Sequence, residues 1–338
     1  MILITPAIRA IRARHPEAHI GIMVGDWSKV ALVGNPYLDE IISYPDSWIQ
    51  NKQPLGCLRL VYRLWKGRFD TAYIFHSHTL IQLMTVLAGI PERYGFFDKN
   101  LKKPGKYLKG KAEWQPNIDR FIADNYLDIP RLNGWQGSDT SLDFFLSDAE
   151  QSQADKLIES HGLTEDQFFI LAPGGGVNPR QNVFAKRWGA DKFIELCNLL
   201  GVTYHLPIVL TGSKQEIPLG EEIAARANGQ IIDLVGKVSF RQAAGLVRRS
   251  QMLVSNDSAI MHIAVAFSKM SLTIFGPSNP HSLMPISEIN QWITSGVDCS
   301  PCYCNSIFAG CEHLRCMTEL SAAQVLERIQ KMLDFHIK

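Results

Sequence analysis

Apolar, strand-like runs alternate with helical patterns along the chain, and this alternation starts twice. In the first half, the strand-like runs are 19–24, 39–43, 71–75 and 93–97. In the second half, they are 168–172, 207–211, 231–234, 252–255 and 272–275. Strands separated by helices are typical of parallel sheets that helices cover on both faces. We therefore predict an α/β protein with two Rossmann-like, doubly wound domains.

The boundary between these domains is expected where the alternation fades. Over 127–143 the sequence turns to Pro, Gly, Asn and Ser, and 338 residues are ample for two domains. We predict an N-terminal domain over 1–140 and a C-terminal domain over 141–338. Doubly wound sheets bind ligands at the carboxyl ends of their strands, so the cleft between the domains is the expected site.

Charge and hydropathy exclude several classes of protein. The chain has 34 Lys and Arg against 33 Asp and Glu, so its bulk charge argues against nucleic acid as a partner. The longest nearly uncharged stretch, 80–91, is too short to span a bilayer. We see no signal peptide and expect a cytoplasmic protein.

The strongest local signal is Ser255-Asn256-Asp257-Ser258-Ala259-Ile260-Met261-His262, which follows an apolar strand. Asn256 or Asp257 is expected to cap the next helix, whose first-turn amides are then open to an anion. Ser258 adds a hydroxyl, and His262 lies one helical turn further along the same face. The pattern suits a diphosphate. Helix capping with a buried core histidine is the alternative.

A second signal is the glycine-rich stretch Ala172-Pro173-Gly174-Gly175-Gly176, again directly after a strand. Gly174 and Gly175 allow a ligand to approach the backbone closely. Lys186 and Arg187 could then supply charge for a phosphate. The alternative is a flexible turn followed by a basic pair at the surface.

Two further loops follow strands, at 211–216 and 275–278. Glu216 could accept hydrogen bonds from ribose hydroxyls, or it could be an exposed acid at a helix start. Ser278 is a weaker candidate at the rim of the cleft. The GxGxxG, P-loop, HExxH, nucleophile-elbow and Asp-x-Asp sequences do not occur, so we expect neither a cofactor nor a metal at the site.

The stretch 93–111 carries seven basic side chains against one acid, Asp98. It is either a solvated loop or a surface for an anionic partner, such as a phosphorylated lipid or a membrane. The candidate residues are Arg93, Lys99, Lys102, Lys103 and Lys106.

Five of the seven cysteines fall close together, as Cys299-x2-Cys302-x-Cys304-x6-Cys311-x4-Cys316. Four thiolates can bind zinc tetrahedrally, although this spacing is not a pair of CxxC sequences. Free thiols, a structural metal, an iron–sulfur cluster and a disulfide therefore all stay open.

Taken together, these stretches resemble glycosyltransferase family 9, which includes the ADP-heptose:lipopolysaccharide heptosyltransferases. The resemblance runs over nearly the whole chain. The matching pieces are 5–10, 35–40, 173–175, 186–188, 254–262, 275–277 and 311–317.

The resemblance implies a GT-B arrangement, in which two Rossmann-like domains face each other across a cleft. It implies a nucleotide-sugar donor, ADP-heptose, in the C-terminal domain and a lipopolysaccharide-core acceptor in the N-terminal one. It also implies inverting transfer without a metal ion, with peripheral contact to the inner-membrane surface. By position, the family's donor-binding lysine falls on Lys186. Its Asp-Thr-Gly-x-x-His motif falls on Asp257, Ser258, Ala259 and His262, with Ser in place of Thr and Ala in place of Gly.

The chain departs from the family pattern at its start. Family members begin with a strand and a Gly-Asp loop, whose Asp is the expected general base. The first strand of the N-terminal domain is therefore missing here, and the base is expected upstream of Met1. Asp26 is only a weak substitute. Two alternatives follow: a nucleotide-sugar-binding protein without turnover, and an epimerase, whose glycine-rich cofactor fingerprint the sequence lacks.

Overall fold

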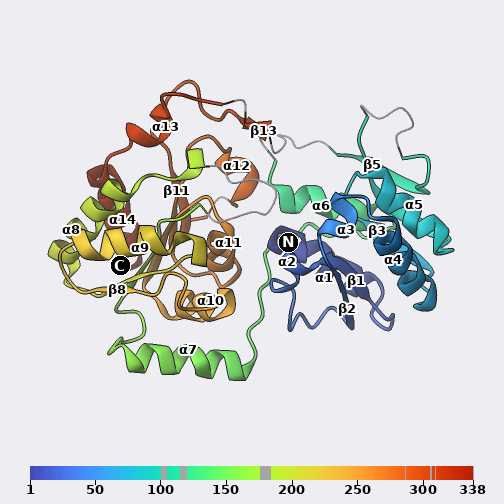
Figure 1. Cartoon of the computed structure of the whole chain (residues 1–338), viewed down its shortest axis with the longest axis horizontal. Coiled ribbons are helices and arrows are strands. Elements are labelled where there is room, and N and C mark those ends of the chain that lie inside the picture. The colour runs from blue at the N-terminus through green and yellow to red at the C-terminus, as the bar shows by residue number, and fades with distance from the viewer. Residues whose placement is uncertain are drawn as a thin grey trace. The chain divides into compact units, whose positions relative to one another are not determined.

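Figure 1 shows the chain as a computed structural model, coloured from blue at the N-terminus to red at the C-terminus. The structure describes residues 1–99, 105–114, 120–175, 184–285, 287–304, 307–308 and 310–337. The chain divides into two compact units, Met1–Phe145 and Leu146–Lys338. Within the described residues, no helix combines the length and the apolar character that crossing a membrane requires.

The second unit is built on one parallel sheet of six strands. In chain order the strands are β6 (Phe169–Ala172), β7 (Ile208–Leu210), β8 (Ile231–Asp233), β9 (Met252–Asn256), β10 (Ser271–Ile274) and β11 (Asn290–Ile293). Their spatial order is β8-β7-β6-β9-β10-β11. The first strand, β6, lies centrally, and the chain changes direction between β6 and β9. This is the topological switch point at which doubly wound sheets bind ligands.

Helices cover this sheet, which explains why its central strands are apolar without alternation. The helices are α7 (Asp148–Ser160), α8 (Ala190–Tyr204), α9 (Ile217–Arg226), α10 (Phe240–Arg249), α11 (Ala259–Ala266), α12 (Pro280–Leu283), α13 (Arg315–Thr318) and α14 (Ala322–Ile337). Short 3₁₀ turns occupy Phe184–Lys186 and Lys214–Glu216, and β12 (Tyr303–Cys304) pairs with β13 (Ile307–Phe308). Leu171, Val254 and Ile274 are fully buried in the main core of this unit.

The first unit contains two separate parallel sheets. One joins β1 (Gly21–Gly25) to β2 (Glu40–Tyr44), and the other has the order β3 (Thr71–Ile74), β4 (Glu92–Phe97), β5 (Gly110–Glu113). Its helices are α1 (Thr5–Arg14), α2 (Asp26–Lys29), α3 (Ser47–Gln50), α4 (Pro54–Lys66), α5 (Thr79–Leu87) and α6 (Ile122–Arg131).

The first unit differs from the second unit in whether a strand joins its two groups of strands into one sheet. In the second unit, β6 joins the two halves of a continuous sheet. In the first unit, no strand among the described residues joins β1 to β3, and Ile2–Ile4 form a 3₁₀ turn. The Thr5 hydroxyl donates to the carbonyl of Ile2, and Thr5 is the first residue of α1.

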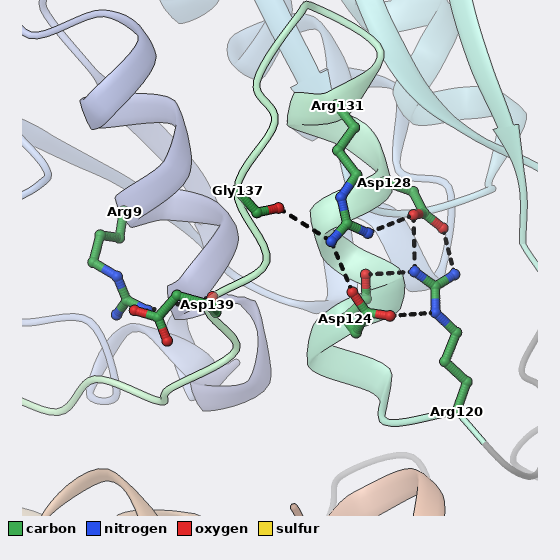
Figure 2. Close-up of polar contacts among 7 residues, drawn as sticks. All are labelled: Arg9, Arg120, Asp124, Asp128, Arg131, Gly137 and Asp139. Carbon is green, nitrogen blue, oxygen red and sulfur yellow. Dashed lines mark hydrogen bonds and ion pairs between the residues drawn. The ribbon is translucent and has the colours of Figure 1, made fainter.

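A compact network of two arginines and two aspartates fixes α6 (Figure 2). Arg120 pairs with Asp124 at 2.6 Å and Asp128 at 2.7 Å, and Arg131 pairs with the same two carboxylates at 3.0 Å each. Arg131 also donates to the carbonyl of Gly137. Because the network contains equal numbers of each charge, these arginines stabilise the fold rather than offer free positive charge.

Candidate functional site

Three loops of the second unit come together at the carboxyl edge of its sheet. Gly174 follows β6, Asp257 follows β9, and Glu216 lies in the turn after β7. The strands β9, β6 and β7 are direct neighbours, so their ends lie side by side. The candidate site therefore lies at the switch point of the sheet, formed by the loops that we predicted to suit a phosphate.

Lys186 and Asp257 form an ion pair at this edge. The distance from Lys186 Nζ to Asp257 Oδ2 is 2.6 Å, and both side chains are largely buried. The ammonium also lies 4.6 Å from the ring centre of Tyr303. The Asp257 carboxylate balances the charge of this buried ammonium in the unliganded protein, and the aromatic face of Tyr303 adds a favourable contact to it.

Asn256 connects two of the loops. Its side-chain amide donates to the carbonyl of Pro173 at 2.7 Å, and its oxygen accepts from the backbone N–H of Trp188 at 3.2 Å. The side chain is fully buried. The prediction that Asn256 or Asp257 caps the next helix is wrong, because Asn256 binds the two loops and Asp257 binds Lys186.

The first turn of α11 keeps its amides open. The helix has Ser258 as its N-cap residue, and the Ser258 side chain makes no capping hydrogen bond. Within the described part of the chain, the amides of Ser258, Ala259 and Ile260 have no hydrogen-bond acceptor. Helix amides without an acceptor favour an anion, and the Ser258 hydroxyl lies beside them.

Glu216 is buried rather than exposed, with 4% of its surface accessible. Its Oε2 accepts from the Ser213 amide at 2.8 Å and from the Ser213 hydroxyl at 2.9 Å. Its Oε1 is buried without a hydrogen-bond partner among the described residues, and Arg187 lies 3.6 Å away. A Cβ added at Gly174 would lie 1.9 Å from this same oxygen, so a residue without a side chain is required there.

His262 lies on α11, one turn after Ser258. Burial lowers the pKa of its imidazole to about 4, with the Asp257 carboxylate opposing this shift and the Lys186 ammonium adding to it. The ring is therefore neutral at pH 7 in the absence of a ligand. Its Nδ1 is buried and has no partner within the described residues.

Sequence analysis did not single out Tyr303, whose ring contacts the Lys186 ammonium although the two residues are more than a hundred positions apart. Ser278, the weaker candidate, is almost fully buried after β10, and its hydroxyl has no partner among the residues described. Burial of this kind depends on tertiary packing, so local sequence does not indicate it.

The basic stretch of the first unit is largely engaged in local contacts. The Arg93 guanidinium donates to the carbonyls of Ile90, Pro91 and Tyr107. Lys99 pairs with Glu113 at 3.0 Å, and the Lys106 ammonium lies 4.3 Å from the ring centre of Tyr107. Lys102 and Lys103 lie outside the described residues. Arg93 is therefore the least suited of these residues to bind an external anion.

The cysteine-rich stretch carries free thiols where it is described. Cys299, Cys302, Cys311 and Cys316 are unpaired, so none of these four forms a disulfide. Burial and the neighbouring thiols raise the pKa of Cys316 to about 11. No group of three or more metal-ligating side chains is found among the described residues. The Cys304 side chain lies outside them.

Comparison with known proteins identifies the family of this chain. The sequence matches glycosyltransferase family 9 (heptosyltransferase) over residues 57–309. The chain belongs to glycosyltransferase family 9. This family membership makes the protein a glycosyltransferase, and the epimerase alternative is set aside.

Relatives and solved structures support the family 9 assignment. The chain is 27% identical over 300 residues to lipopolysaccharide heptosyltransferase 2 of Escherichia coli, covering 83% of this chain and 80% of the relative. The structure of E. coli ADP-heptose lipopolysaccharide heptosyltransferase II matches with a TM-score of 0.76 at 22% identity, covering 100% of this chain and 96% of the other. A family 9 glycosyltransferase structure from Veillonella parvula matches with a TM-score of 0.81 at 19% identity, covering 98% and 93%. These two matches confirm the predicted two-domain α/β architecture.

Proposed function

We propose that this protein transfers a heptose from ADP-heptose to a lipopolysaccharide-core acceptor, with inversion at the anomeric carbon and without a metal ion. The observation that carries the proposal is the open first turn of α11 next to the buried ammonium of Lys186. The names of its relatives supply the sugar and the acceptor class.

The donor would bind at the carboxyl edge of the second unit. The amides of Ser258 and Ala259 and the ammonium of Lys186 would hold the diphosphate. Glu216 would accept from the ribose hydroxyls, because its Oε1 has no hydrogen-bond partner within the described residues. Gly174 and Gly175 would let the nucleotide approach the backbone.

The reaction breaks one bond and forms one bond. The acceptor hydroxyl attacks the anomeric carbon from the face opposite the diphosphate, and the anomeric C–O bond breaks with its electron pair going to ADP. Lys186, the α11 amides and neutral His262 would stabilise the negative charge that develops on the leaving diphosphate. In this role they replace a divalent metal.

The attacking hydroxyl must lose a proton to a base, and the described carboxylates do not assign one. Asp26 follows β1 at the carboxyl end of a strand in the first unit, where the acceptor would bind. Asp26→Asn therefore tests this weak substitute. A loss of about 10²-fold or more in the transfer rate would assign it the role, and an unchanged rate would exclude it.

The acceptor would be recognised as an anion by the first unit. Lys99 and Lys106 would contribute, together with Lys102 and Lys103, while Arg93 mainly holds its own loop. A core acceptor is attached to a lipid, so the enzyme would work at the cytoplasmic face of the inner membrane.

The first test is a thermal-shift panel of ADP-, UDP- and GDP-sugars with EDTA present throughout. We expect a selective shift with ADP-sugars that EDTA does not abolish. Lys186→Ala should remove the shift, and Lys156→Ala, an exposed lysine on α7, serves as the matched control. An equal shift in Lys186→Ala would reject the proposed diphosphate site.

A transfer assay with ADP-heptose and heptose-deficient lipopolysaccharide then separates enzyme from binding module. Product with inverted anomeric configuration supports the proposal. A selective ADP-sugar shift without any product would instead favour the alternative, a nucleotide-sugar-binding protein without turnover.

A further inference from the structure

Helix α4 exposes large apolar side chains to solvent. The exposed fractions are 74% for Leu55, 60% for Leu58, 59% for Tyr62 and 61% for Trp65. These four residues, named here the apolar stripe, are three or four positions apart and therefore lie along one side of the helix. Leu60 and Leu64 of the same helix are buried in the core. The helix thus has a second apolar surface that its own unit does not cover.

The two aromatic residues of the apolar stripe lie together. The ring centres of Tyr62 and Trp65 are 5.9 Å apart. Helix α4 packs beside α3 and α5, which Figure 1 labels next to it. Leu87, at the end of α5, is also 60% exposed. Clustered exposed apolar side chains mark an interaction surface, whereas isolated ones do not.

Basic residues adjoin the apolar stripe. Three basic residues are exposed on α4. Arg59 lies four positions after Leu55, Arg63 lies four positions before Gly67, and Lys66 directly follows Trp65. The helix contains no Asp or Glu. Among the described carboxylates, none forms an ion pair with these three cations. Arg63 donates to the carbonyl of Ser43, and the Arg59 guanidinium lies 5.8 Å from the Trp48 ring centre.

The apolar stripe together with the basic residues beside it favours one kind of partner. Tyr and Trp favour the boundary between lipid headgroups and acyl chains, and Lys and Arg beside them pair with anionic headgroups. A surface that buried the stripe in a protein would not need uncompensated cations along its edge. We propose that α4 docks the protein on an anionic lipid surface, with the apolar stripe in the headgroup region. This inference rests on the proposed function, because a lipid-attached acceptor requires the enzyme at a membrane.

The inference places the membrane contact on α4. The sequence had indicated the basic stretch 93–111 for this role instead. In the structure, its described residues Arg93, Lys99 and Lys106 are engaged with carbonyls, a carboxylate and a ring. The cations of α4 have no carboxylate partner among the described residues, and the apolar stripe lies beside them on the same helix.

Vesicle sedimentation of the full chain tests the proposal. The probes are vesicles of phosphatidylethanolamine with phosphatidylglycerol and vesicles of phosphatidylcholine alone. We expect the wild type to bind only the anionic vesicles, and less strongly at high salt. Tyr62→Ser with Trp65→Ser should weaken binding about tenfold or more, and so should Arg59→Glu with Arg63→Glu and Lys66→Glu.

Matched controls lie on the second unit. Val202→Ser removes an apolar side chain that is 75% exposed on α8, and Lys156→Glu reverses an exposed charge on α7. Both controls should sediment like the wild type. Every altered residue is exposed, and equal thermal transitions in the absence of vesicles would verify that the variants fold.

The outcomes separate docking from the proposed function. Equal sedimentation of the wild type and both α4 variants overturns the docking inference, whatever the nucleotide panel shows. Vesicle binding that depends on α4, in a protein that gives no ADP-sugar shift, supports docking and contradicts the proposed function. A dimer that forms without vesicles and is lost in Tyr62→Ser with Trp65→Ser, together with no vesicle binding, would assign the stripe to a second copy and overturn docking.

Discussion

The ammonium of Lys186 lies 2.6 Å from the carboxylate of Asp257, although 71 residues separate them in the chain. The pair neutralises a buried cation in the unliganded protein. It also holds that cation at the residue that directly precedes Ser258, the N-cap residue of α11. Asp257 therefore has two opposing effects on an anionic ligand: it positions the ammonium, and it repels the diphosphate.

The first prediction concerns the balance of these two effects. Asp257→Asn keeps a side chain of the same size and removes its charge. We expect ADP to bind about three- to tenfold more tightly, because one negative charge beside the diphosphate is gone. We also expect the free energy of unfolding to fall by about 3 kcal/mol, since the buried ammonium of Lys186 loses its partner. Calorimetry with ADP and thermal unfolding measure the two effects.

Lys186→Ala and Asp257→Asn together separate the positioning of the ammonium from the repulsion of the diphosphate by Asp257. Lys186→Ala should weaken ADP binding by about 10²-fold, because a charge-assisted contact is lost. Weaker ADP binding in Asp257→Asn than in the wild type would show that positioning dominates, contrary to our expectation.

The second prediction uses two neighbouring glycines. A Cβ at Gly174 would lie 1.9 Å from Glu216 Oε1, whereas a Cβ at Gly175 would meet nothing closer than 3.4 Å. Gly174→Ala should therefore displace the Glu216 carboxylate, weaken ADP-sugar binding about tenfold and lower the melting temperature by several degrees. Gly175→Ala is the matched control for the contact with Glu216, and it should leave the melting temperature little changed. An equal fall in melting temperature in both variants would argue against the Gly174–Glu216 contact as the cause.

Much of this fold could be predicted because the strands of the second unit are apolar runs between amphipathic helices. The predicted strand 168–172 is β6, and the predicted strand 252–255 is β9. Local sequence could not reveal β11, because Asn290–Ile293 is a short edge strand with polar residues. Helix α6 runs into the stretch 127–143, which we expected to be irregular, because Pro130 is a loop signal in sequence yet lies in the last turn of this helix.

The candidate site was predictable only in part. Glycines, a lysine and a helix start after strands are local signals, and they converge at the switch point because parallel strands end at one edge. The burial of Glu216, the role of Asn256 between two loops and the stacking of Tyr303 on Lys186 depend on residues distant in the chain. No local pattern indicates such contacts.

The third prediction concerns acid stability of the second unit. Arg241 pairs with Glu150, and its hydrogen bond is the main cause that lowers the pKa of this carboxyl to about 2. A lowered pKa stabilises the fold fully above the ordinary value near 4.5, and the stabilisation is lost as the pH falls from there toward 2. Glu150→Gln should lower the free energy of unfolding by about 2 kcal/mol at pH 7, and its difference from the wild type should shrink below about pH 4.

Thermal unfolding across pH 3–8 measures this difference. Asp155→Asn is the control, because Asp155 pairs with Arg249 but is 52% exposed, so its removal should cost about 0.5 kcal/mol or less. A difference between Glu150→Gln and the wild type that stays constant down to about pH 3 would contradict the assigned role of this carboxylate.

The fourth prediction follows from the neutral state of His262. Burial holds its pKa near 4 in the unliganded protein, and a diphosphate bound at the start of α11 would raise that pKa by opposite charge. Binding should then take up a fraction of a proton at about pH 5–6, and affinity should increase as the pH falls through this window. ADP-glucose is the suitable probe, because its diphosphate does not titrate there. Calorimetry in buffers of different ionisation enthalpy measures the uptake, which His262→Gln should abolish while retaining binding at pH 8. The same uptake in His262→Gln would assign the proton to another group and remove His262 from the diphosphate site.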